Sequence, residues 1–176
     1  AGPGHGILYD LGSHMIDQVL QLFGRPRAIL AHLQQQRPGV GATDAFDWIG
    51  DYGHLQAHLS SNCLTPSPSF RFSLIGDQET FVKSGLDPQE DALQAGRVPA
   101  GPDWGCEPAE RWGVLVGSGQ KVPTHPGTYP QFYANLVASL QGQQALAVRP
   151  EEARDVIRAL ELAQESHRLR GWVNWS

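Results

Sequence analysis

Cysteine and long apolar runs are both scarce in this sequence, and each shortage excludes a class of protein. The only two cysteines among 176 residues are Cys63 and Cys106, too few for the disulfide framework of a small secreted domain. They form no CxxC pair or Cys/His cluster of the kind that binds zinc. No apolar run approaches the roughly 18 residues that cross a bilayer, and the first residues lack the basic and apolar regions of a signal peptide. We therefore expect a cytoplasmic protein without a membrane partner.

Positively charged residues are also fewer than negatively charged ones. Lysine and arginine together number 13 against 18 aspartates and glutamates, which gives a net charge of −5. Without a basic stripe, nucleic acid is not an expected partner. The hydrophobic content of 40% and the charged content of 18% are typical of a globular protein. The length suits a single domain spanning residues 1–176.

A glycine-rich GxGxxG loop between a strand and a helix is also missing, so the chain has no recognisable dinucleotide-binding segment. Apolar spacing predicts a helix over residues 10–23, and Val156, Leu160 and Ala163 mark the buried stripe of a last helix over 150–170. Further helices are expected at 87–94 and 130–141, and strands at 27–35, 46–52, 55–61, 69–75, 79–83 and 111–116. Helix, consecutive strands, then helices is an α+β order with antiparallel pairing.

The strongest candidate for chemistry is the start of the first helix. Asp10 and His14 are four residues apart, so a helix places them on one face. A carboxylate beside an imidazole raises the imidazole pKa and fixes its tautomer. Such a side chain gives or takes a proton near neutral pH. Gly12, between them, costs about 1 kcal/mol relative to alanine in a helix, which indicates a steric reason for it.

Two other interpretations of this segment remain open. Asp10 could simply cap the helix while His14 is an exposed histidine. A metal site could instead be built from Asp10 and His14 with His5 or Asp17, as in a metal-dependent lyase or hydrolase. That interpretation lacks a second histidine at ligand spacing, so no metal is expected.

Several motifs, in order along nearly the whole chain, resemble the family of glucose–fructose oxidoreductase, inositol dehydrogenase and MocA. The first has the pattern Gly-x-Gly-x-x-x-Asp-x-Gly-x-His-x-x-Asp over residues 4–17. Others are RFSLIG at 71–76, KSGLDPQE at 83–90, WGCEP at 104–108, GxYxxFY at 127–133 and the helix from EEA at 151–153 to Ser166. One departure is that His5 stands where the family often has consecutive glycines.

The resemblance implies a particular architecture. Members have an N-terminal Rossmann domain that binds NAD or NADP, followed by a C-terminal α+β domain related to that of glyceraldehyde-3-phosphate dehydrogenase. This second domain has an open, mostly antiparallel sheet with helices packed on one face, and the open face commonly mediates oligomerisation. The chain corresponds to the second domain. The Rossmann domain, with its Glu-Lys-Pro lysine, is absent from the chain, so we expect no turnover from the chain alone.

The resemblance also implies roles for the candidate pair. His14 would be the general acid and base at a hydroxyl or carbonyl of a sugar, cyclitol or related polyol, and Asp10 would orient His14 or bind the substrate. Four further residues are weaker candidates for substrate contacts: Lys83, Trp104, Tyr129 and Tyr133. Each also has a plain structural interpretation, as an exposed lysine, a loop anchor or a packed tyrosine.

A non-catalytic role is the alternative function. Phe70, Phe72 and Leu74 alternate with polar residues and so share one strand face. An exposed apolar face of this kind would make the chain a dimerisation or binding module, and we expect a homo-oligomer through the sheet face.

Overall fold

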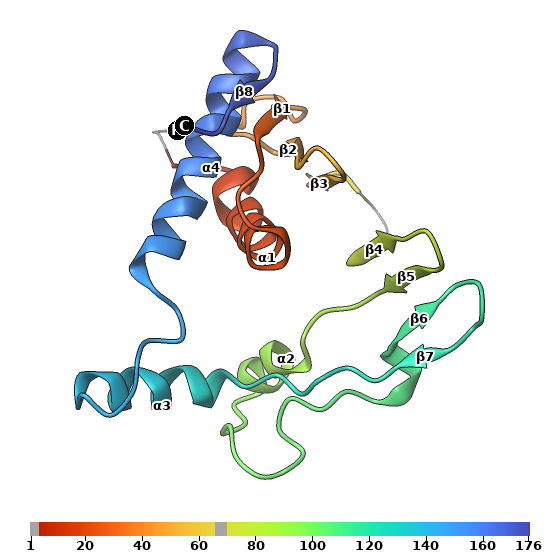
Figure 1. Cartoon of the computed structure of the whole chain (residues 1–176), viewed down its shortest axis with the longest axis vertical. Coiled ribbons are helices and arrows are strands. Elements are labelled where there is room, and N and C mark those ends of the chain that lie inside the picture. The colour runs from red at the N-terminus through yellow and green to blue at the C-terminus, as the bar shows by residue number, and fades with distance from the viewer. Residues whose placement is uncertain (1–3, 66–69) are drawn as a thin grey trace. The chain divides into compact units, whose positions relative to one another are not determined.

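The computed structural model describes residues 4–65 and 70–176, which form two compact units (Figure 1). The first unit combines residues 1–65 with residues 148–176, and the second unit runs through residues 66–147. The first unit carries the predicted catalytic pair, and the second carries the four weaker candidates.

The first unit is a four-stranded antiparallel sheet with helices on one face. Its strands lie in the order β3-β2-β1-β8. The elements in chain order are the π-helix η1 (Leu8–Gly12), α1 (Ser13–Phe23), β1 (Ala28–Gln34), β2 (Ala45–Asp51), β3 (Gln56–Asn62), α4 (Pro150–Leu169) and β8 (Val173–Asn174). α4 packs on β1, and α1 packs on α4 (Figure 1).

The core of this unit follows from strand alternation. Phe46 and Trp48 of β2 are buried, and Trp48 pairs with Ala31 of β1 on the same face. The predicted stripe of α4 is confirmed, because Val156, Leu160 and Ala163 are all buried there. The opposite face of β1 and β2 carries polar side chains such as His32 and Asp47, which are cross-strand partners.

The outer edge of β1 is completed by the last turns of α4. β8 pairs only with Ala28 and Ile29. Beyond that point the Ala31 N–H donates to the Ser166 hydroxyl at 2.8 Å, and the Leu33 N–H donates to Nδ1 of His167 at 3.2 Å. Side chains of a helix thus satisfy backbone donors that would otherwise face an open sheet edge.

Replacing Ser166 by alanine is expected to destabilise the first unit by about 1–3 kcal/mol, because the buried Ala31 N–H would lose its acceptor. Urea unfolding followed by circular dichroism measures the loss. Ser60→Ala, at an exposed position of β3, is the matched control and should change the unfolding free energy by less than about 0.5 kcal/mol. Equal effects of the two substitutions would contradict the edge-capping role.

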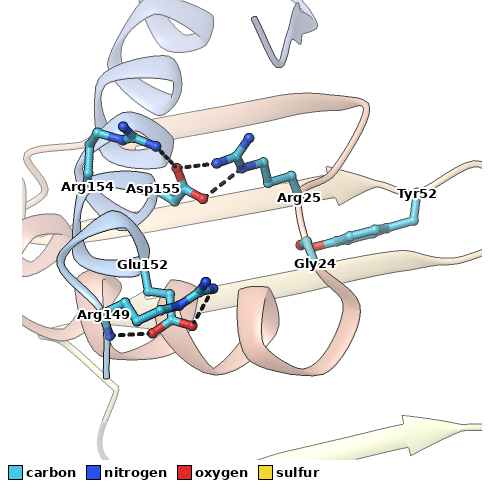
Figure 2. A network of polar contacts seen from close by, with 7 residues as sticks. All are labelled: Gly24, Arg25, Tyr52, Arg149, Glu152, Arg154 and Asp155. Atoms are coloured by element: carbon cyan, nitrogen blue, oxygen red, sulfur yellow. Dashed lines mark hydrogen bonds and ion pairs between the residues drawn. The ribbon is translucent and has the colours of Figure 1, made fainter. Parts of the chain in front are cut away.

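Polar contacts hold the C-terminal end of α1 in place (Figure 2). Arg25, just after the helix, makes a bidentate ion pair with Asp155 of α4, with N–O distances of 2.7 and 2.9 Å. The Tyr52 hydroxyl donates to the Gly24 carbonyl at 2.9 Å, and burial raises the pKa of Tyr52 to about 12. The C-terminal end of α1 is therefore tied both to α4 and to the turn after β2.

The second unit has its own four-stranded antiparallel sheet, in the order β4-β5-β6-β7. Its elements are β4 (Phe72–Ile75), β5 (Thr80–Lys83), α2 (Pro88–Gln94), the 3-10 turn η2 (Ala109–Arg111), β6 (Gly113–Leu115), β7 (Lys121–Val122) and α3 (Tyr129–Leu140). Among its described residues few side chains are buried, and Gln89, Ala92 and the side chain of Glu107 are among them.

The predicted fold class is confirmed: the protein is α+β, with open antiparallel sheets. Two details differ from the expectation. The strands form two sheets rather than one, because alternation identifies a strand but not its neighbours. The predicted strand over 69–75 appears as β4, while its first residue, Ser69, lies outside the described residues.

Candidate active site

The predicted catalytic pair lies where the chain enters α1. Asp10 belongs to η1 and His14 is the second residue of α1, and both residues are exposed. The buried side of these helices is formed by Leu8, Ile16 and Val19. Within the described chain no hydrogen bond joins Asp10 to His14. Neither residue lines the two clefts described below. The pair is thus open to a partner or ligand from outside this chain, and its chemistry stays a prediction.

The backbone around Asp10 is held firmly even though the side chain is exposed. The Ile7 N–H donates to the Thr43 carbonyl at 2.8 Å, and the Tyr9 and Asp10 N–H groups both donate to the Gly6 carbonyl at 3.1 Å. Gly6 has a φ of 97° and lies so close to Thr43 that a Cβ would meet its carbonyl oxygen. The turn that follows is a π-helix. This geometry is rare in proteins as a whole, but where it occurs it is often part of a functional site.

The steric reason for Gly12 is packing inside the protein. A Cβ at this position would lie 3.2 Å from Leu8 Cδ1 and 3.3 Å from Phe46 Cζ. The glycine therefore lets the helix approach the β2 side chain of Phe46 closely. The surface it leaves free faces the core, not the solvent side that Asp10 and His14 share.

Lys83, predicted to contact substrate, is engaged in an ion pair. Its ammonium group lies 2.5 Å from a carboxylate oxygen of Glu107 and donates to the Arg111 carbonyl at 2.9 Å. The Glu107 side chain is 2% exposed. Burial alone would raise the Glu107 pKa, but hydrogen bonds from Lys83 and Thr124 and the charges of Lys83 and Arg111 outweigh it, so the pKa is lowered.

Lys83→Met is expected to destabilise the second unit by about 3 kcal/mol, because it leaves the Glu107 carboxylate buried without its main partner. Thermal unfolding at neutral pH measures the loss. Since the folded-state pKa of Glu107 is lowered, the stabilisation is present above the ordinary glutamate pKa and is lost as the pH falls through the lowered value. Adding Glu107→Gln to Lys83→Met should recover part of the stability, and a double variant no better than the single one would refute this account.

Trp104 and Tyr129 meet at a buried glutamine that the sequence reasoning missed. The Trp104 indole N–H donates to Gln89 Oε1 at 2.7 Å, and the Tyr129 backbone N–H donates to the same oxygen at 3.0 Å. Asp87 accepts from both the backbone and the side-chain amide of Gln89 at 2.9 Å. A glutamine in the first turn of a helix gives no sequence signal of this role.

The two tyrosines differ in their surroundings. Burial, followed by the charges of Asp87 and Glu90, raises the pKa of Tyr129. Tyr133 is largely exposed, with its ring edge-on to Phe132 at a centroid distance of 5.3 Å. Both project from the first turns of α3, but only the Tyr129 backbone joins the Gln89 cluster.

Trp104 also lines a cleft of about 600 Å³ in the second unit, together with His125, Thr128 and Gln131 and the loop at residues 99–102. Lys83, Tyr129 and Tyr133 do not line it. Of the four weaker candidates, the structure therefore brings one to a cleft. Nothing in the sequence marked His125 as its neighbour there.

Within residues 4–65 and 70–176, no group of three or more His, Cys, Asp or Glu side chains is placed to hold a metal ion. In the same described part of the chain, no helix combines the length and apolar character that a bilayer span requires.

Comparison with known protein families gives one match over almost the full length. Residues 1–175 match the model described as the oxidoreductase family, C-terminal alpha/beta domain, which covers the glucose–fructose oxidoreductase, inositol dehydrogenase and MocA proteins. The chain belongs to this family. The resemblance inferred from the motifs is thereby confirmed.

Individual relatives of this oxidoreductase domain are longer than the chain. It is 42% identical to scyllo-inositol 2-dehydrogenase (NADP(+)) IolW of Bacillus subtilis (strain 168), covering 94% of the chain and 48% of the relative. It is 38% identical to the uncharacterized oxidoreductase YdgJ of Escherichia coli (strain K12), covering 96% and 50%. The structure of yvaA from Bacillus subtilis has a TM-score of 0.92 at 38% identity, covering 100% and 53%. The chain thus spans about half the length of the curated relatives it matches.

Proposed function

We propose that this chain is the substrate-binding half of an NAD(P)-dependent oxidoreductase that acts on a hydroxyl group of a cyclitol, sugar or related polyol. The observation that carries the proposal is the 42% identity to an inositol dehydrogenase whose name specifies NADP(+). The matched region is about half of that relative, so the nicotinamide would be bound mainly by a Rossmann domain outside this chain.

The geometry of η1 and α1 supports the roles proposed for the pair. Asp10 and His14 are exposed, and the Ile7 N–H just before them donates to the Thr43 carbonyl, so the pair is accessible on a backbone that is held in place. The nicotinamide, held by the domain outside this chain, would supply the hydride acceptor for the carbinol carbon. His14 takes the proton that the hydroxyl releases as the carbonyl forms, and returns it in the reverse direction. Asp10 orients His14 or binds a neighbouring substrate hydroxyl.

The substrate contacts proposed for the second unit have unequal support. Trp104 lines a cleft, and a flat indole suits the apolar face of a sugar or cyclitol ring. Tyr129 and Tyr133 begin an exposed helix and remain predictions. Lys83 is the weakest, because its ammonium would have to leave Glu107 to reach a ligand.

The test is polyol-dependent reduction of NADP and NAD by the enzyme in which this chain is joined to its nicotinamide-binding domain. Inositols, glucose and glycerol form the substrate panel. We expect turnover with a ring polyol and none with glycerol, and none from the chain alone. Reduction of NADP by the chain alone, or no activity of the joined enzyme on any ring polyol, would overturn the proposal.

A second candidate function is a non-catalytic dimerisation module, favoured by exposed apolar side chains around β4. Phe70 and Leu74 are 60% and 42% exposed, whereas Phe72 is half-buried. Sedimentation of the chain, with and without Leu74→Lys, tests this role. A concentration-dependent dimer that the substitution disrupts would support it, and a monomer at all concentrations would exclude it.

A further inference from the structure

We propose that a cleft at the C-terminal end of α4 binds a phosphate group, either free or esterified to a small hydroxylated molecule. The cleft has a volume of about 640 Å³ and lies entirely within the first unit. His32, His167, Arg168, Arg170 and Asp47 line it. Two of these lining residues are arginines and two are histidines, whose side chains carry the donors that recognise a phosphate oxyanion. The inference is independent of the function proposed for Asp10 and His14.

A hydrogen bond fixes the tautomer of His167, one of the residues that line this cleft. Its Nδ1 accepts a hydrogen bond from the Leu33 N–H at 3.2 Å. A ring nitrogen that accepts carries no proton, so the proton of the neutral ring lies on Nε2. The His32 ring lies beside it, with the ring centroids 5.8 Å apart. The same contact that protects the edge of β1 thus fixes the tautomer that His167 offers to a ligand.

Arg170 occupies a backbone position that disfavours arginine. Its φ of 54° is the only positive value at a non-glycine residue in the described part of the chain. Helices commonly end with glycine in this left-handed conformation, because a Cβ is strained there. Gly171 follows directly, one position too late to relieve that strain. A strained arginine that lines a cleft is typical of a functional constraint on the side chain.

The helix dipole alone does not account for these cations. The C-terminus of a helix carries about half a negative charge, which cations in its last turn offset. His167 and Arg168 already lie in the last turn of α4. Arg170 adds a full positive charge beyond the helix end, so the cleft keeps an excess of positive charge for an anion.

The remaining lining residues suggest what the phosphate is attached to. Asp47 is the cross-strand partner of His32, and its carboxylate is an acceptor for hydroxyl groups. A second phosphate group on the ligand would be repelled by this carboxylate, which disfavours diphosphates and nucleic acids. Leu30 and Ile49 supply an apolar wall. The phosphate monoester of a small sugar or polyol matches this combination better than a nucleic acid or a diphosphate.

The test is a titration of the purified protein followed by the NMR signals of the His32 and His167 rings, at constant pH and ionic strength. Inorganic phosphate, glucose 6-phosphate and glucose are the three probes. We expect saturable shifts with both phosphates and none with glucose. Tighter binding of glucose 6-phosphate identifies an ester as the ligand, and equal binding identifies free phosphate. Absence of saturable shifts with both phosphates would overturn the proposal.

Variants separate binding from folding. Arg170→Gly and Arg168→Gln should each weaken phosphate binding by about tenfold or more, as expected for the loss of one charged hydrogen bond. Arg170→Gly should at the same time raise the melting temperature without phosphate, because glycine relieves the left-handed backbone. Arg154→Gln removes the same charge from α4 away from the cleft and should leave affinity unchanged. Unchanged affinity in both cleft variants would refute the site.

Discussion

Replacement of His14 by glutamine is expected to lower the kcat of polyol oxidation by about 10²–10⁴-fold in the enzyme joined to its nicotinamide-binding domain. Glutamine keeps a polar side chain of similar length but cannot accept the hydroxyl proton at neutral pH. KM should change far less than kcat, because proton transfer stabilises the transition state and not the bound substrate. His14 is exposed and outside the core, so the variant should fold normally.

The controls for this prediction distinguish catalysis from a general loss of histidine. His58→Gln changes another exposed histidine of the first unit, on β3, and should leave kcat unchanged. In the parent enzyme the pH profile of kcat should show a limb that disappears in His14→Gln. Asp10→Asn should retain His14 but displace that limb. A fall in kcat below about threefold in His14→Gln would rule out general acid–base catalysis by His14.

Side-chain patterns in the sequence were sufficient for the fold class and for most elements of the first unit. Apolar spacing located α1 and α4, and alternation located β1, β2 and β3 to within one residue or so at each end. These signals are strong because a buried face repeats every two or every three to four residues. The same helical repeat predicts that Asp10 and His14, four residues apart, share one face of a helix.

What the sequence could not show depends on partners far along the chain. β7 and β8 are two residues long, too short for any periodicity, and neither was among the predicted strands. The π-helix at residues 8–12 begins next to a bridge between Gly6 and Thr43, which lie far apart in the sequence. The left-handed backbone at Arg170 was hidden as well, because the predicted helix over 150–170 included this residue.

The second large effect is expected in the core of the first unit, at Trp48. This side chain is fully buried, between cross-strand neighbours Ala31 and Leu59. Gly50 makes room for the indole, since a Cβ there would lie 2.5 Å from Trp48 Cη2. Trp48→Ala should therefore lower the free energy of unfolding by about 3–5 kcal/mol, through lost apolar burial and the cavity left behind. Urea unfolding followed by far-ultraviolet circular dichroism measures it.

The substitution Trp48→Phe separates the contribution of the indole N–H from that of the apolar ring. Within the described chain the indole Nε1 is buried and has no hydrogen-bond partner, so the tryptophan already carries the cost of a buried, unpaired donor. Phenylalanine removes this donor while keeping most of the apolar bulk, and we expect it to cost less than about 1.5 kcal/mol. Trp172→Phe, at a half-exposed position, controls for the loss of an indole and should be nearly neutral. Trp48→Phe as destabilising as Trp48→Ala would contradict this account. The indole N–H would then have to make a favourable contact, because packing alone could not explain why the fold keeps tryptophan there.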